Sequence, residues 1–158
     1  MIFQGQEFLQ YGRFDASKEL DWNLAGAESG ILALYRDLIR HRRNWFNNTR
    51  GLCGQSLNFH HVNNTDKVIA FHRWDQGGPG DDVVVLINMA NQSYDNYKIG
   101  MPRSGMWRVR FNSDWNGYSS DFRNHPSFDT QAMSGGRDGM PFSADVGLGC
   151  YSAVILSQ

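Results

Sequence analysis

Apolar and polar residues alternate with two different periods along this chain, a helical period in residues 29–44 and a strand pattern after residue 48. In residues 29–44 the apolar residues recur every three to four positions, which places them on one face of a helix. The stripe consists of Ile31, Leu32, Leu34, Tyr35, Leu38 and Ile39. Ser29 precedes it as a candidate N-cap, and Arg40–Arg43 end it where the helix dipole favours cations. The pattern predicts an amphipathic helix whose basic end is solvated.

After residue 48 the pattern changes to short strands separated by turns. Residues 82–89 are apolar almost throughout, which predicts a central strand buried on both faces. Further strands are predicted at residues 57–62, 67–74, 94–99, 106–111 and 150–156. About six strands at this spacing are typical of an antiparallel β-sandwich. Residues 112–145 are rich in Asn, Asp, Ser and Gly, and their weak periodicity predicts a long irregular region.

The first part of the chain has a different organisation. Residues 1–8 are interpreted as a buried strand that ends at a polar turn, and residues 9–28 as a long loop of the kind that usually carries function. A strand, a loop and a helix form one unit of an α/β barrel, and one unit cannot bury its own faces. We therefore expect the tail of a larger enzyme, with a barrel remnant over residues 1–46 and an all-β domain over residues 50–158. The apolar stripe of the helix is expected to dock on the β domain or to cause self-association.

Composition narrows the classes of function. Charged residues make up 20% of the chain and the formal net charge is -1, so neither a nucleic-acid-binding face nor a polybasic membrane anchor is expected. The aliphatic run Val83–Ile87 is too short to span a bilayer, and no secretory leader is visible. A cytoplasmic location is therefore expected, with Cys53 and Cys150 as reduced thiols.

No cofactor and no metal site is predicted. The glycines at residues 77–80 lack the strand, lysine and helix that a phosphate-binding loop requires. His60 and His61 point to opposite faces of their predicted strand, so only one of them could meet His72 across the hairpin. Because zinc needs a third protein ligand, these histidines are interpreted as surface or interface residues.

Candidate chemistry at the start of the chain rests on one carboxylate. Glu7 follows the predicted first strand, at the position where a barrel enzyme places active-site groups. A single carboxylate does not form the acid/base pair that glycoside cleavage requires. Two interpretations of Glu7 therefore stay open, a supporting active-site residue and a structural residue.

Aromatic residues in polar loops are the second candidate. Trp115 and Tyr118 lie among Asn112, Asp114 and neighbouring polar residues. Sugars present flat apolar faces ringed by hydroxyl groups, which an aromatic ring and nearby amides or carboxylates complement. The favoured alternative for Trp115 is a ring that fills a minor core beneath the loop.

Several segments, taken in order, resemble glycoside hydrolase family 13 of the glucan branching enzyme type. The segments MIFQGQEF (1–8), LDW (20–22) and LYRDLIR (34–40) resemble the end of its catalytic barrel. The segments DKVIAFHR (66–73), VVVLIN (83–88), SYDNYKIG (93–100) and WRVRFNSD (107–114) resemble the first hairpin and middle strands of its C-terminal all-β domain. The fold class implied is mainly β, an antiparallel β-sandwich preceded by the last strand and helix of a truncated (β/α)8 barrel.

The resemblance implies cleavage of an α-1,4 link through a covalent glycosyl intermediate. In a branching enzyme the cut chain moves to a 6-hydroxyl, whereas water accepts it in an amylase-like hydrolase. The implied partners are an α-glucan (glycogen, amylose or starch) and the missing catalytic barrel in cis. No catalytic residue is expected in this chain, which should be inactive alone; Gly5, Gln6, Glu7 and Trp22 are expected only near the active site. A non-catalytic glucan-binding module and a purely structural β-module remain the alternatives.

Overall fold

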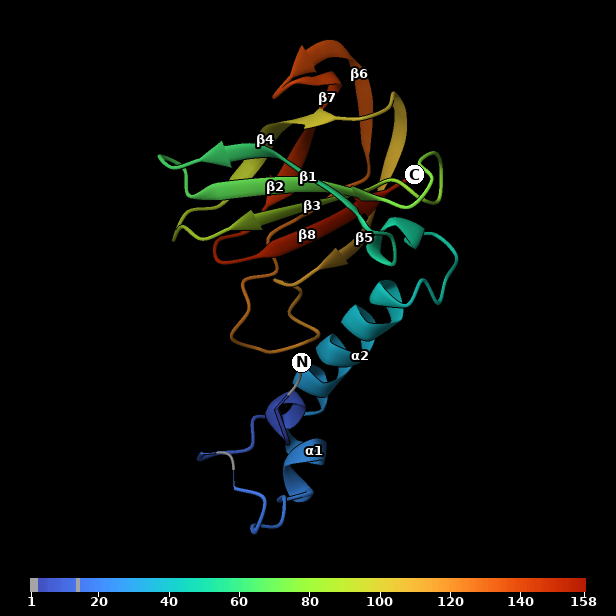
Figure 1. Ribbon diagram of the computed structural model, residues 1–158. Helices are drawn as coiled ribbons and strands as arrows, with labels where there is room; N and C mark the ends of the chain where they lie inside the picture. The colour runs from blue at the N-terminus through green and yellow to red at the C-terminus, as the bar shows by residue number, and fades with distance from the viewer. Residues whose placement is uncertain (1–2, 14) are drawn as a thin grey trace.

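The computed structural model describes residues 3–13 and 15–158 (Figure 1). The helical elements are η1 (Gln6–Phe8), α1 (Asn23–Ala27), α2 (Ser29–Arg42) and η2 (Arg50–Leu52), where η denotes a 3-10 turn. The strands are β1 (Ser56–Asn63), β2 (Val68–Trp74), β3 (Val83–Asn88), β4 (Tyr94–Met101), β5 (Gly105–Asn112), β6 (Thr130–Arg137), β7 (Met140–Leu148) and β8 (Ala153–Ser157). In Figure 1, α2 leads away from the strands and carries α1 and η1 at its far end.

The strands form one antiparallel eight-stranded sheet in the order β1-β2-β3-β8-β5-β6-β7-β4. The sheet folds over on itself, because a single buried cluster joins side chains of β2, β3 and β8 to side chains of β4 and β7. Its largest fully buried member is Trp107 of β5, whose indole nitrogen donates to the carbonyl of Arg103 at 3.1 Å. The mainly β, two-layered architecture predicted from the sequence is therefore confirmed.

Strand β3 lies at the centre, as its apolar sequence predicts. It pairs with β2 on one side and β8 on the other, and five of its six residues are buried. Val84 and Leu86 face the main core, whereas Val83 and Val85 face a second cluster on the other side of the sheet. A strand covered on both faces carries no polar alternation, which explains the continuous apolar run.

Helix α2 begins and ends close to the predicted positions, and one face of it docks on the sheet. Ala33, Leu34 and Leu38 pack against the second cluster. The predicted N-cap is wrong, because Ser29 is the first helical residue and Glu28 occupies the cap position without a side-chain hydrogen bond. The basic end is not fully solvated, because His41 is buried and burial lowers its pKa.

The predicted first strand is wrong for residues 3–8, and residues 1 and 2 lie outside the described residues. Residues 6–8 form η1, which is flanked by left-handed backbone at Gly5 (φ 79) and Leu9 (φ 56). A strand needs a neighbouring strand to pair with, and the sheet formed by the described residues does not include this segment. Its backbone instead closes on itself, from Gln6 N to Phe3 O at 3.0 Å and from Gln10 N to Gly5 O at 2.9 Å. The described residues therefore contain no barrel strand at this position.

Two irregular regions contain more structure than predicted. The expected loop over residues 9–28 includes α1. The expected irregular region over residues 112–145 includes β6 and most of β7, which raises the strand number from about six to eight. Only Thr130 and Ala132 are buried in β6, so its sequence carries almost no apolar pattern.

Two further properties of the described residues bear on the earlier expectations. None of their helices combines the length and apolar character needed to cross a membrane. Cys53 is exposed, Cys150 is buried, and both are free thiols.

Candidate functional site

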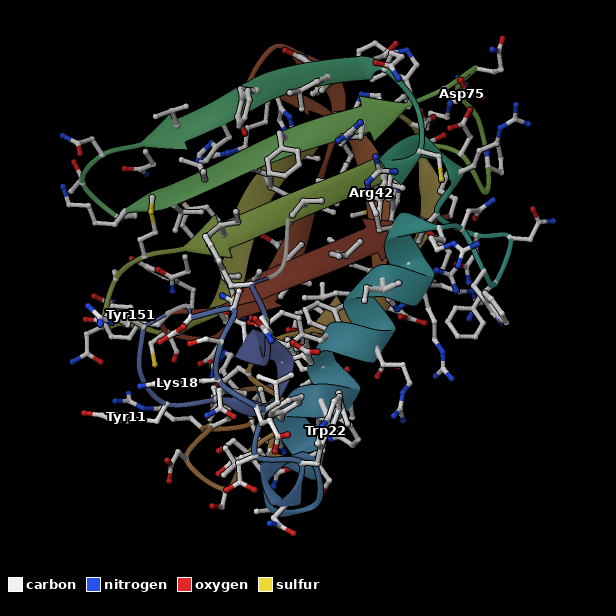
Figure 2. The ribbon with its side chains drawn as sticks, turned by 60° about the horizontal axis from the view of Figure 1, so that its bottom comes forward. Tyr11, Lys18, Trp22, Arg42, Asp75 and Tyr151 are labelled. Carbon is white, nitrogen blue, oxygen red and sulfur yellow. The ribbon has the colours of Figure 1, made fainter. Side chains whose placement is uncertain are left out.

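The four residues predicted near an active site do not share one cavity. Gln6 lines a cavity of ≈ 530 Å³ together with residues 9–13 and 18–20, whereas Glu7 lines a different groove along α2. Gly5 is buried in the turn before η1. Trp22 is 70% exposed and packs against the buried ring of Phe8, with ring centroids 5.5 Å apart. Trp22 lies at the end of α2 that is far from the sheet (Figure 2).

The groove that contains Glu7 runs along the outward face of α2 and has a volume of ≈ 340 Å³. Its walls combine apolar, aromatic and cationic side chains, namely Leu32, Tyr35, Arg36, Ile39, Arg40, Arg43 and Trp45. Oε2 of Glu7 is buried and has no hydrogen-bond partner among the described residues. An unpartnered buried acceptor is costly, so this face of α2 is suited to receive a further surface.

The loop between β5 and β6 is built around the buried carboxylate of Asp114. Its oxygens accept hydrogen bonds from the backbone nitrogens of Arg123 at 3.0 Å and His125 at 2.8 Å. These bonds close residues 114–125 into a compact turn. Asp114 was expected among the groups that could contact a sugar, but its side chain organises the loop instead.

The two aromatic residues predicted to contact glucan have different environments. Tyr118 is 7% exposed, and its hydroxyl donates to Oδ2 of Asp37 on α2 at 2.9 Å. Burial, followed by the nearby Asp37 carboxylate, raises the pKa of Tyr118, so its hydroxyl stays protonated. Trp115 is 49% exposed, and its ring meets that of Tyr118 edge-on at 4.9 Å and 87°. Tyr118 is thus a buried supporting residue, whereas Trp115 can contact a ligand.

Trp115 borders a pocket of ≈ 390 Å³ between β5 and the loop. The pocket is lined by Val109, Arg110, Phe111, Asn112, Trp115, Tyr118, Asn124, His125, Pro126 and Ser127. Arg110 already donates to Ser157 at 2.8 Å, and burial lowers its pKa. Asn124 is exposed, and no hydrogen bond donated by its side-chain nitrogen is found among the described residues. An exposed ring beside an available amide suits a neutral ligand with an apolar face and hydroxyl groups.

His61 and His72 form hydrogen bonds within the β domain. His61 contacts Asp138 through Nδ1 at 3.1 Å and the hydroxyl of Tyr97 through Nε2 at 2.9 Å. His72 contacts Asp82 at 2.9 Å. A bulge between Phe59 and His61 shifts the register of β1. Within residues 3–13 and 15–158, no three His, Cys, Asp or Glu side chains come together as metal ligands.

A folded-over antiparallel sheet around one buried core defines an all-β domain. Residues 59–158 match the family described as "Alpha amylase, C-terminal all-beta domain". The chain therefore belongs to this family.

Curated relatives extend the similarity to the helical region. The chain is 32% identical over 118 residues to the 1,4-alpha-glucan branching enzyme GlgB of Paramagnetospirillum magneticum. This alignment covers 72% of this chain and 16% of that protein. It is 29% identical over 168 residues to the protein of the same name from Rhodococcus jostii, with 99% of this chain and 22% of that protein covered. The chain thus spans between 16% and 22% of the length of these two relatives.

Proposed function

We propose that this chain is the C-terminal part of a 1,4-alpha-glucan branching enzyme of glycoside hydrolase family 13. The observation that carries the proposal is the similarity to branching enzymes across 99% of the chain, helices included. In this proposal residues 1–46 belong to the catalytic barrel and residues 50–158 form the all-β domain. The parent protein acts in the cytoplasm on glycogen or a related α-glucan.

The proposed reaction cleaves an α-1,4 link and transfers the cut chain to a 6-hydroxyl, which creates a branch. A retaining mechanism of this kind needs a nucleophilic carboxylate and an acid on opposite sides of the bond. We place both of them outside these 158 residues, so the chain alone does not catalyse the transfer. Gly5, Gln6, Glu7 and Trp22 then lie next to the active site of the parent protein without taking part in bond cleavage.

The all-β domain is proposed to support the barrel through α2. One face of α2 packs on the sheet through Leu34 and Leu38, which leaves the opposite face and its groove available. The exposed Ile39 and Trp45, with Oε2 of Glu7, which has no hydrogen-bond partner among the described residues, give this groove the apolar and polar groups of a domain interface. The occupant proposed for the groove is the remainder of the catalytic barrel in cis.

A second proposed task of the domain is contact with α-glucan at Trp115. The exposed indole would cover the apolar face of a glucose unit, and Asn124 would bond its hydroxyl groups. This contact also favours the alternative of a non-catalytic glucan-binding module. It does not distinguish a branching enzyme from the tail of an amylase-like hydrolase.

A chimeric enzyme tests the proposal. The segment of the Rhodococcus jostii enzyme that aligns with this chain is deleted and then replaced by residues 1–158. We expect the deletion to abolish branching, measured as the loss of iodine staining of amylose together with the appearance of α-1,6 links, and the replacement to restore it. Because transfer leaves the number of reducing ends unchanged, an increase in reducing ends would favour the hydrolase instead.

The isolated chain supplies the matched control. It should leave amylose unchanged, because the proposed carboxylates are absent from it. Branching by the isolated chain would contradict the placement of the catalytic residues. A chimera that folds but stays inactive would contradict the proposal that this segment supports the barrel.

A further inference from the structure

The loop that carries Trp115 is fixed to α2 as well as to the sheet. Tyr118 reaches across to α2 and donates its hydroxyl proton to Asp37 at 2.9 Å. The backbone of the loop also lies directly on α2, because a Cβ atom at Gly30 would overlap the carbonyl oxygen of Tyr118. The phenol ring of Tyr118 packs against Phe111 with centroids 5.8 Å apart. Tyr118 is therefore held between a strand of the β domain and the helix.

The position of the Trp115 ring depends on this arrangement. Its indole meets the edge of the Tyr118 ring and lies over Gly117, where a Cβ atom would overlap the indole. The backbone nitrogen of Tyr118 donates to the carbonyl of Trp115 at 3.0 Å, so the two residues share one tight turn. A change in the position of Tyr118 must therefore move the exposed ring of Trp115.

We propose that Asp37, acting through Tyr118, positions Trp115, so that α2 and the β domain share a single binding element for a linear α-glucan. This inference rests on the glucan contact proposed above and adds α2 to it. Asp37 and Tyr118 are positioning residues that do not touch the sugar, because Tyr118 is buried and its hydroxyl is already bonded to Asp37. Trp115 alone supplies the stacking surface.

The chemistry of the pocket favours a neutral glucan over an anionic ligand. Nε and Nη2 of Arg110 already donate to Ser157 and to the carbonyl of Gln158, so that edge of the guanidinium is not available for a bidentate bond to a phosphate. A volume of ≈ 390 Å³ with one exposed ring suits one or two sugar units. Binding through one ring and few hydrogen bonds is weak, so the element would hold a long chain near the enzyme without enclosing it.

Titration of the 158-residue chain with maltoheptaose by calorimetry tests the inference. Trp115→Ala should abolish measurable binding. Tyr118→Phe keeps the ring but loses the bond to Asp37, and Asp37→Ala loses the acceptor, so each should weaken binding about 3- to 10-fold. Asp37→Asn retains an acceptor oxygen and should bind within about twofold of the unchanged chain.

A second measurement separates positioning from general destabilisation. With 5-fluorotryptophan incorporated, the ¹⁹F resonance of Trp115 (assigned by Trp115→Phe) should shift in Tyr118→Phe and Asp37→Ala and stay in place in Asp37→Asn. Asp37 also forms an ion pair with Arg40 at 3.3 Å. Arg40→Gln therefore serves as the matched control, because it removes that ion pair and leaves the Tyr118 bond.

The outcomes distinguish this inference from the proposed glucan contact. If Trp115→Ala binds maltoheptaose like the unchanged chain, the proposed glucan contact of Trp115 is wrong. The inference of a shared binding element is then wrong as well. If Trp115→Ala abolishes binding while Tyr118→Phe and Asp37→Ala bind normally with an unshifted ¹⁹F resonance, only the role of Asp37 is wrong. An effect of Arg40→Gln as large as that of Asp37→Ala would also overturn that role.

Discussion

Strand β3 and the apolar stripe of helix α2 both predict burial, but the structure buries them to very different extents. Five of the six residues of β3 are buried, whereas His41 is the only buried residue of α2. The strand lies between two packed clusters, and the helix contacts the sheet along one face only. Apolar sequence therefore marks a closed core in one region and a surface that needs a partner in the other.

The comparison predicts that the core is the place where a substitution costs most. Leu86→Ala removes a fully buried side chain of β3 and should lower the free energy of unfolding by about 2–5 kcal/mol. Urea unfolding followed by circular dichroism measures the loss. Leu86→Met conserves volume and should cost less than about 1.5 kcal/mol. A cost below about 1 kcal/mol for the alanine variant would mean that the two layers are not a close-packed unit.

A change at Gly30 should release the helix without unfolding the β domain. Gly30→Ala forces a Cβ atom into the carbonyl of Tyr118 and should weaken the docking of α2 by about 1–3 kcal/mol. Hydrogen exchange of the amides of α2 should accelerate while that of β3 stays slow. Gly26→Ala in α1 has open space around the new methyl group and is the matched control. Equal acceleration in both elements would contradict the independence of the two regions.

Alkaline pH should weaken the β domain through Tyr97. Burial raises the pKa of Tyr97 to about 12, above the ordinary value of 10.0. Because the folded state holds this proton more tightly, its stabilising contribution is complete below pH 10 and is lost as the pH rises towards 12. Tyr97→Phe should cost about 1 kcal/mol at pH 7 and show a shallower fall across that window.

The control for this experiment is Tyr11→Phe, because Tyr11 is 96% exposed. Its unfolding free energy should follow that of the unchanged chain from pH 7 to pH 12. If the two variants have the same pH dependence, the proton on Tyr97 does not contribute to the stability of the fold.

The smallest effect is expected at the surface of the sheet. Lys98 of β4 and Asp145 of β7 form an ion pair at 3.1 Å, and both side chains are about half exposed. Lys98→Ala should change the free energy of unfolding by no more than about 0.5 kcal/mol, and 1 M salt should remove the difference. A loss above about 1 kcal/mol would place part of the stability outside the buried core.

The sequence predicted the elements whose burial is complete or strictly one-sided. The period of α2 and the continuous apolar run of β3 are both of this kind. β6 was missed because only two of its residues are buried, and a strand with one weakly covered face carries no alternation. The strand expected at the start of the chain is absent from the described residues 3–8, because an apolar segment forms a strand only beside other strands.

The candidate site was predictable in its residue types but not in their roles. Trp115 and Tyr118 are close in sequence and both aromatic, so spacing alone could not show which one is exposed. The answer depends on Asp37, which is far away in the chain and becomes the partner of Tyr118 only after α2 docks. Asp114 was missed as the organiser of the loop for a similar reason, since its hydrogen bonds run to backbone groups that no side-chain pattern reveals.

Strands β1 and β4 are the two ends of the sheet, and they are also the strands that Tyr97 connects. From β4 its hydroxyl meets His61 at 2.9 Å and accepts a hydrogen bond from Asn63 at 3.1 Å, both from β1. An open sheet end offers unpaired backbone groups to which other chains can add in aggregates. By fastening one end to the other, this polar cluster brings the sheet close to a closed ring. We therefore expect its loss to appear first as aggregation of the protein during storage.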